Sequence, residues 1–165
     1  MVISAPVRAR LITAISTALL TGALTAPTAY AETAGQYVRT ESGRVRCWVM
    51  ANDQGHGGGP AVACEASGPM SPPWNQWENK GFPQAPMSGT ADLHWDLVVV
   101  NAAGAFHWDD GNIGAAHPTN DVILNYGQTY HIQGWTILPS SDGTRFTNDG
   151  TGHGMFVSIE NVYSF

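Results

Sequence analysis

The residues best suited to chemistry lie in two copies of the tripeptide His-Trp-Asp, at residues 94–96 and 107–109. Histidine nitrogens and aspartate oxygens are common ligands of zinc and similar divalent ions. The second copy begins thirteen residues after the first, a spacing that fits the two arms of one β-hairpin. If both arms turn their polar side chains to one face, they form a candidate metal site of His94, Asp96, His107 and Asp109.

The register of that hairpin decides whether the four side chains meet. A four-residue loop at 101–104 pairs Val99 with Phe106, which gathers the tryptophans on an apolar face and the polar side chains on the other. A three-residue loop with a glycine bulge shifts the pairing by one and turns His107 and Asp109 toward apolar neighbours. Because burying unpaired polar groups costs free energy, we expect the four-residue loop.

The polar face of the hairpin has three interpretations: a solvated surface, a metal or catalytic site, or a partly buried hydrogen-bond network. The solvated surface is favoured, because residue spacing across a hairpin is far less diagnostic of a metal site than HExxH on a helix. We therefore expect no cofactor, with a divalent metal held by this face as the alternative.

A second candidate is the turn-rich segment 67–89, which contains five prolines and is therefore neither helix interior nor central strand. Its aromatic residues Trp74, Trp77 and Phe82 need a surface to lie on. They either pack under the loop as a small satellite cluster, which is the favoured interpretation, or form an exposed platform. In the second case Trp74 and Trp77 are candidate ligand-binding residues.

Other motifs carry weaker signals. Asp142, Asn148 and Asp149 lie among glycines, but the segment lacks the alternating calcium-loop pattern, so turns are favoured. His153, between two glycines, is interpreted as a surface histidine. No GxSxG, HExxH, SxxK or GxGxxG motif is present, and nothing sets the separation of the carboxylates that glycoside hydrolysis would need. The carboxylates considered for that role are Glu78, Asp96, Asp109 and Asp110.

The N-terminal segment 1–31 predicts a secretory signal peptide. Arg8 and Arg10 precede an apolar stretch of small residues, and Ala29-Tyr30-Ala31 fits a cleavage site. Cleavage leaves 5 basic and 13 acidic residues, a formal charge of −8, which disfavours nucleic acid and anionic lipid surfaces as partners. No later stretch is apolar enough to span a membrane.

In an exported chain, Cys47 and Cys64 predict a disulfide. Alternating patterns in 42–51 and 61–66 place the two cysteines on neighbouring strands that flank a glycine-rich loop. Eight short strand-like segments separated by turn residues predict an all-β fold, an antiparallel sandwich or small barrel of about seven or eight strands. We expect one β domain at 44–165, preceded by a polar lead at 32–43.

Several stretches together resemble a group of small secreted proteins of mycobacteria and related actinobacteria, which are uncharacterised. They are "GRVRCWV", "VACEASG", "GFPQAP", "NDVILNYGQTYHIQGWTI" and "DGTRFTNDGTGHGMFVSIENVYSF". The resemblance covers nearly the whole mature chain, and its last two stretches are the most specific. It implies a secreted or cell-envelope location and transfers no catalytic residue.

The expected function is that of a non-enzymatic binding or structural domain, extracellular or in the cell envelope. Its partner would be an envelope glycan or a ligand on a host or cell surface. The alternative is a metal-dependent hydrolase centred on the His/Asp cluster of the 93–110 hairpin.

Overall fold

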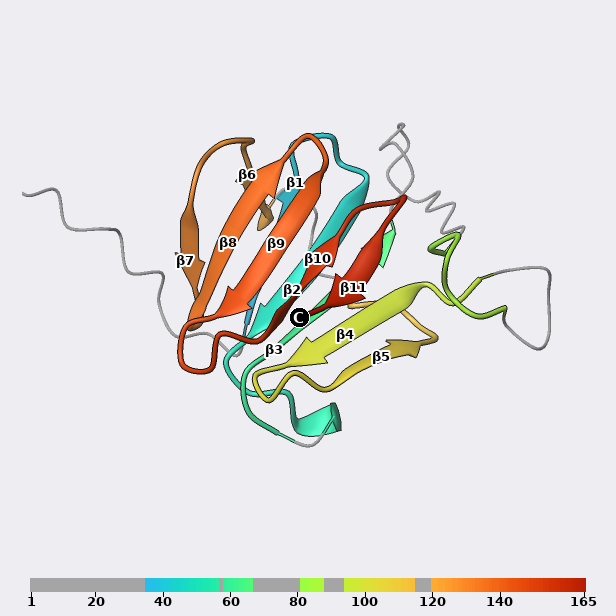
Figure 1. The fold of residues 1–165 in the computed structure, drawn as a ribbon, viewed down its shortest axis with the longest axis horizontal. Helices are drawn as coiled ribbons and strands as arrows, with labels where there is room; N and C mark the ends of the chain where they lie inside the picture. Colours follow the sequence, from blue (N-terminus) through green and yellow to red (C-terminus); the bar gives the residue numbers. More distant parts are fainter. Residues whose placement is uncertain (1–34, 57, 67–80, 88–93, 115–119) are drawn as a thin grey trace, which may run out of the picture.

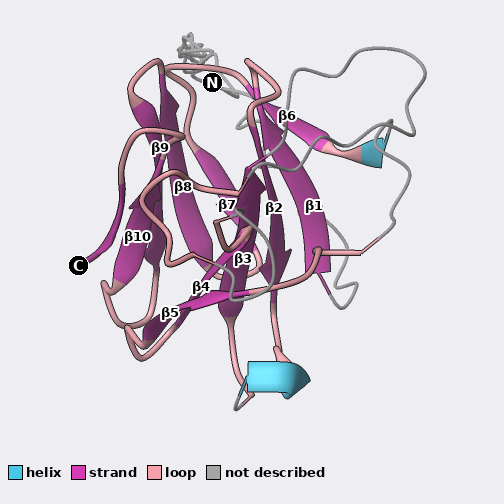
Figure 2. Ribbon diagram, turned by 90° about the vertical axis from the view of Figure 1, so that its right-hand side faces the viewer, coloured by secondary structure: helices cyan, strands magenta, loops and turns pink. Residues whose placement is uncertain are grey.

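The computed structural model describes residues 35–56, 58–66, 81–87, 94–114 and 120–165. These residues form eleven strands in two sheets and one short 3-10 turn, η1 at Gln54–His56. The sheets pack face to face as two layers, with β8 to β10 in one and β1 to β3 in the other (Figure 2). The all-β prediction is confirmed, and of its two forms the chain adopts the sandwich.

The first sheet has six strands in the order β5-β4-β3-β2-β1-β6. All neighbouring pairs are antiparallel except β1 and β6, which are parallel. The 61–66 segment forms a strand over its whole predicted length. The strands are β1 (Gly35–Thr40), β2 (Val45–Met50), β3 (Ala61–Ala66), β4 (Leu97–Asn101), β5 (Phe106–Asp109) and β6 (Val122–Leu124).

The second sheet is an antiparallel meander of five strands, seen side by side in orange and red in Figure 1. Two of the eight strand-like segments, 128–138 and 154–165, each form two strands instead of one. The first is divided at Gln133 and Gly134, which both have positive φ. The strands are β7 (Tyr130–Ile132), β8 (Trp135–Ser140), β9 (Gly143–Asn148), β10 (Gly154–Val157) and β11 (Val162–Ser164).

The polar lead predicted at 32–43 is wrong in its described part, because residues 35–40 form β1. This strand is hydrogen-bonded between β2 and β6 inside the first sheet. Its buried residues Val38 and Thr40 alternate with more polar ones, a pattern too short and too polar to stand out in the sequence.

The main core lies between the sheets and takes alternate residues from both. Trp135, Ile137 and Phe146 are fully buried on the second sheet and face Val49 and Val62 of the first. Because side chains alternate along each strand, the remaining residues of these strands point to the two outer faces of the sandwich.

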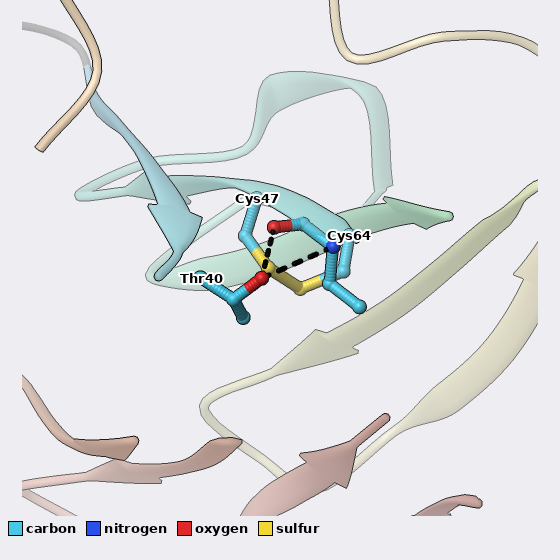
Figure 3. The surroundings of a disulfide bond; sticks show 4 residues. Thr40, Cys47 and Cys64 are labelled. Atoms are coloured by element: carbon cyan, nitrogen blue, oxygen red, sulfur yellow. Dashed lines mark hydrogen bonds between the residues drawn. A yellow bond between two sulfur atoms is a disulfide. The ribbon is translucent and has the colours of Figure 1, made fainter. Parts of the chain in front are cut away.

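The predicted disulfide is confirmed. Cys47 on β2 and Cys64 on β3 are directly opposite each other, with Cα atoms 4.0 Å apart. The bridge lies in the inter-sheet core beside Thr40, whose hydroxyl bonds the backbone of Val45 (Figure 3). In the chain-entropy model, closing a loop of this size stabilises the fold by about 3 kcal/mol.

Described residues between the two edge strands, β5 and β6, pack on the outer face of the first sheet. We call residues 110–114 together with Asp121 the strap. Ile113 of the strap is 5% exposed and packs on an apolar cluster that includes Leu97, Val99 and Trp48.

A buried ion pair anchors the strap. Arg46 on β2 donates two hydrogen bonds to the carboxylate of Asp121, at 2.7 and 3.0 Å, and a third to the Gly114 carbonyl at 3.2 Å. Its guanidinium also lies 4.5 Å from the centre of the Tyr37 ring and 3.8 Å from Glu65. Arg46 is therefore buried, at 3% exposed, and β2 is buried on both faces, although its alternating sequence pattern is typical of a strand with one buried face.

Two further side chains hold the strap through its backbone. The Tyr37 hydroxyl donates to the Ile113 carbonyl at 2.9 Å, and the Ile113 N–H donates to Glu65 at 3.3 Å. Burial raises the pKa of Glu65, while the Ile113 N–H and the Arg46 charge oppose that shift. Side chains from β1, β2 and β3 thus bind the strap at Ile113 or at the adjacent Gly114.

We predict that Asp121→Asn destabilises the protein by about 3 kcal/mol or more, because it leaves the Arg46 charge buried without its partner. The matched control is Glu160→Gln, which breaks the exposed pair between Arg44 and Glu160, 52% and 63% exposed. That change costs less than about 1 kcal/mol. Urea unfolding measures both, and equal effects would contradict the anchoring role of Arg46.

We predict that wild type loses stability relative to Glu65→Gln as the pH rises. In the unfolded chain the Glu65 carboxyl ionises near pH 4.3, whereas in the folded protein its pKa is raised. The loss of stability therefore begins near pH 4.3 and ends above the folded pKa of Glu65. Arg46, Asp96 and Asp121 are the charged groups near Glu65 in both proteins. Unfolding free energies measured at a series of pH values test this, and a pH-independent difference would contradict it.

Candidate functional site

The hairpin that carries the two His-Trp-Asp copies adopts the register that the sequence argument rejected. Val99 is opposite His107 and Val100 is opposite Phe106, a shift of one residue. The loop has three residues, 102–104, and ends at Gly104 with φ 83°. This is the glycine-bulge alternative, and the expected four-residue loop is wrong.

The reason for this register is that β4 is buried on both faces. Val98 and Val100 lie in the inter-sheet core, while Leu97 and Val99 pack under the strap. Its partner β5 is an edge strand whose residues are all partly exposed. His107 and Asp109 thus share the strap face with apolar residues without being fully buried, so the desolvation cost that favoured the other register is small.

Two of the four candidate metal ligands, His94 and Asp96, bind separate backbone groups. The ring of His94 hydrogen-bonds the Ala85 carbonyl at 2.6 Å, and Asp96 accepts from the Gly111 N–H at 2.9 Å. Burial raises the pKa of Asp96. Asp109 is opposite Leu97, as His107 is opposite Val99. Among the described residues, no group of three or more His, Cys, Asp or Glu side chains could hold a metal ion.

The tryptophans of the two copies point inward, as expected. Trp95 and Trp108 pack on the inter-sheet core, where Phe82 lies 5.6 Å from Trp108 between ring centres. Phe82 belongs to the main core and not to a satellite cluster. Trp74, Trp77 and Glu78 lie outside the described residues, so their role stays a prediction.

The weaker candidates serve turns. Asn148 accepts hydrogen bonds from the N–H groups of Gly150 and Thr151 in the β9–β10 turn, so the turn interpretation is confirmed there. Asp142 lies in the β8–β9 turn. His153 is exposed, as expected, and its ring lies against Gly104 of the β4–β5 loop.

A site that the sequence argument missed lies on the outer face of the second sheet. Leu138 on β8 pairs with Arg145 on β9. Arg145 pairs with Phe156 on β10, and Phe156 pairs with Tyr163 on β11. Strand spacing makes this row roughly 14 Å long. Leu138 is 43% exposed and Tyr163 is 50% exposed, so its two ends are open to solvent.

Glycines in the same strands make room for the aromatic rings of this row. A Cβ at Gly143 would clash with the Phe156 ring, and one at Gly154 would clash with the Phe146 carbonyl and lie 2.9 Å from the Phe165 ring. Phe156 and Tyr163 stack with ring centres 5.2 Å apart. The Arg145 guanidinium lies 3.4 Å from the centre of the Phe165 ring. We call Leu138, Arg145, Phe156, Tyr163 and Phe165 the aromatic face.

Polar side chains lie on the same outer face, on the β7 side. Thr136 is opposite His131 on β7 and Thr147 on β9. Its hydroxyl donates to Asp149 at 2.5 Å and lies 3.1 Å from Nδ1 of His131. Because that hydroxyl has one proton, Nδ1 of His131 is the donor in the second bond, which leaves Nε2 as the other polar atom of the ring.

The signal for the aromatic face is weak in the sequence. Each strand contributes one large residue to this face, in "TIL", "TRF", "MFV" and "VYS", which is ordinary for a surface strand. Only the pairing of four strands brings these residues into one row.

Comparisons with protein-family models, curated proteins and solved structures find no match to this chain. Within the part of the chain that the structure describes, no helix is long and apolar enough to cross a membrane.

We predict that Gly104→Ala costs more stability than Gly127→Ala. Both glycines have positive φ, 83° and 77°, but a Cβ at Gly104 meets the His153 ring at 3.0 Å while the space around Gly127 is open. Gly127→Ala should cost about 1 kcal/mol from backbone strain alone. In a His153→Ala background the two costs should converge. Equal costs in the presence of His153 would contradict this packing of the hairpin loop.

Proposed function

We propose that the protein is an exported, non-enzymatic binding domain that holds a glycan of the cell envelope or extracellular space on its aromatic face. The observation that carries the proposal is the row of large side chains that crosses four neighbouring strands on a sheet face open at both ends.

The chemistry of this face suits a sugar polymer. Aromatic rings stack on the C–H faces of sugar rings, and a row across several strands offers contacts to successive sugar units. The nearby Thr147 and His131 offer a hydroxyl group and the Nε2 atom of an imidazole to sugar hydroxyls. An apolar row bordered by hydrogen-bonding groups is the composition expected of a recognition surface.

The shape of the face favours binding over catalysis. Catalytic sites exclude water and hold reacting groups in a concave pocket, whereas this row lies on the outer face of a sheet with exposed ends. The His/Asp arrangement on which the hydrolase alternative depended requires the register that the hairpin does not adopt.

Export is supported by the predicted signal peptide, the resemblance to small secreted proteins, and a disulfide in the core. Disulfides form and persist in oxidising compartments, which agrees with an extracellular or envelope location.

The test is binding of the mature protein, residues 32–165, to a panel of immobilised neutral and acidic polysaccharides. Tyr163→Ala should weaken binding by about tenfold or more, as expected when an exposed aromatic side chain of a binding surface is truncated. The matched control is Tyr126→Ala, which removes another exposed tyrosine, located in the turn after β6, and should leave binding unchanged.

Two results would contradict the proposal. One is the absence of binding to every polysaccharide in the panel. The other is binding that survives Tyr163→Ala but is lost in the double variant Trp74→Ala and Trp77→Ala, which would place the site on the 67–89 segment.

A further inference from the structure

We propose that Arg145 makes the aromatic face selective for glycans that carry carboxylate groups, such as polyuronates. This inference rests on the proposed function and adds the class of ligand. It follows from the position of Arg145, the way its guanidinium is held, and the contrast with the other arginines.

Arg145 occupies the centre of the aromatic face. It stands between Leu138 and Phe156 in the cross-strand row, and its side chain is exposed. A ligand that spans the row from Leu138 to Tyr163 must therefore pass over or beside the guanidinium.

The guanidinium is held in place by Phe165. Its central carbon lies 3.4 Å from the centre of that ring, so the Phe165 ring covers one side of the guanidinium. Stacking restricts the long side chain and leaves the N–H groups, which lie in the guanidinium plane, for acceptors at its edge. A carboxylate matches this fork of donors with two parallel hydrogen bonds.

The two arginines that form ion pairs in the described part of the chain differ from Arg145. Arg46 is bound by Asp121 in the core, and Arg44 pairs with Glu160 at the surface. Among the described residues, no carboxylate makes an ion pair or hydrogen bond with Arg145. A cation that stacks on an aromatic ring, without an acidic partner in the described chain, provides a complementary charge for an acidic ligand.

The net negative charge of the chain opposes binding by charge alone. The formal charge of the full chain is −6, so every polyanion, with or without sugar rings, is repelled at long range. At physiological salt, charges more than about 8 Å away are largely screened. The Arg145 guanidinium, which would be in direct contact with the ligand, then determines the electrostatic contribution to binding. An acidic ligand should bind only if its rings also stack on the face.

The experiment measures the affinity of the mature protein for polygalacturonate and for its methyl ester, which has the same sugar backbone without the charges. Wild type should bind the acid form about tenfold more tightly, the gain expected of a charge-assisted bidentate contact. In Arg145→Gln this ratio should fall to about one while binding to the methyl ester persists. Arg44→Gln, at the other exposed arginine, is the control and should keep the wild-type ratio.

The outcomes separate this inference from the proposed function. Equal binding of both polymers by wild type, or an unchanged ratio in Arg145→Gln, overturns the role of Arg145 while leaving glycan binding in place. Equal binding of poly-glutamate overturns it too, since charge alone would then suffice. Binding of neither polymer, nor of any other polysaccharide, overturns both proposals.

Discussion

The buried charge of Arg46 is the constraint on which the rest of the architecture depends. A guanidinium at 3% exposure is tolerable only with a hydrogen-bonded counter-ion, and Asp121 supplies it from the chain that leads into β6. That pairing ties Asp121, next to β6, to the outer face of β2, and β6 pairs in parallel with β1. On the opposite face of the same strand, the adjacent Cys47 joins β3 through the disulfide, so β2 is anchored on both sides.

This arrangement gives the two outer faces of the sandwich different roles. The face of the six-stranded sheet is closed by Ile113 and its apolar neighbours, and its polar groups bind the strap. The face of the five-stranded sheet presents Leu138 and Tyr163 to solvent in one row with Arg145. The recognition surface that we propose therefore lies on the second face, whereas the first face packs against the strap.

The sequence predicts those features of the fold whose pattern lies within a short segment, and it misses those that depend on distant residues. The strands at Cys47 and Cys64 and their bridge were predictable, because a period of two and a single possible cysteine pairing suffice. The predicted hairpin register is wrong because it requires β4 to have a single apolar face, whereas β4 is buried on both faces. The burial of Arg46 and the aromatic face depend on partners far along the chain, which no local pattern displays.

The most direct test of the central claim is a map of backbone and arginine side-chain NMR shifts during titration of the mature protein with polygalacturonate oligomers. The account predicts shifts concentrated at β8 to β11, including the Nε–H of Arg145 and the amide of Tyr163, with the strap residue Ile113 unchanged. Shifts confined to the segment around Trp74 and Trp77, or to the strap, would contradict it.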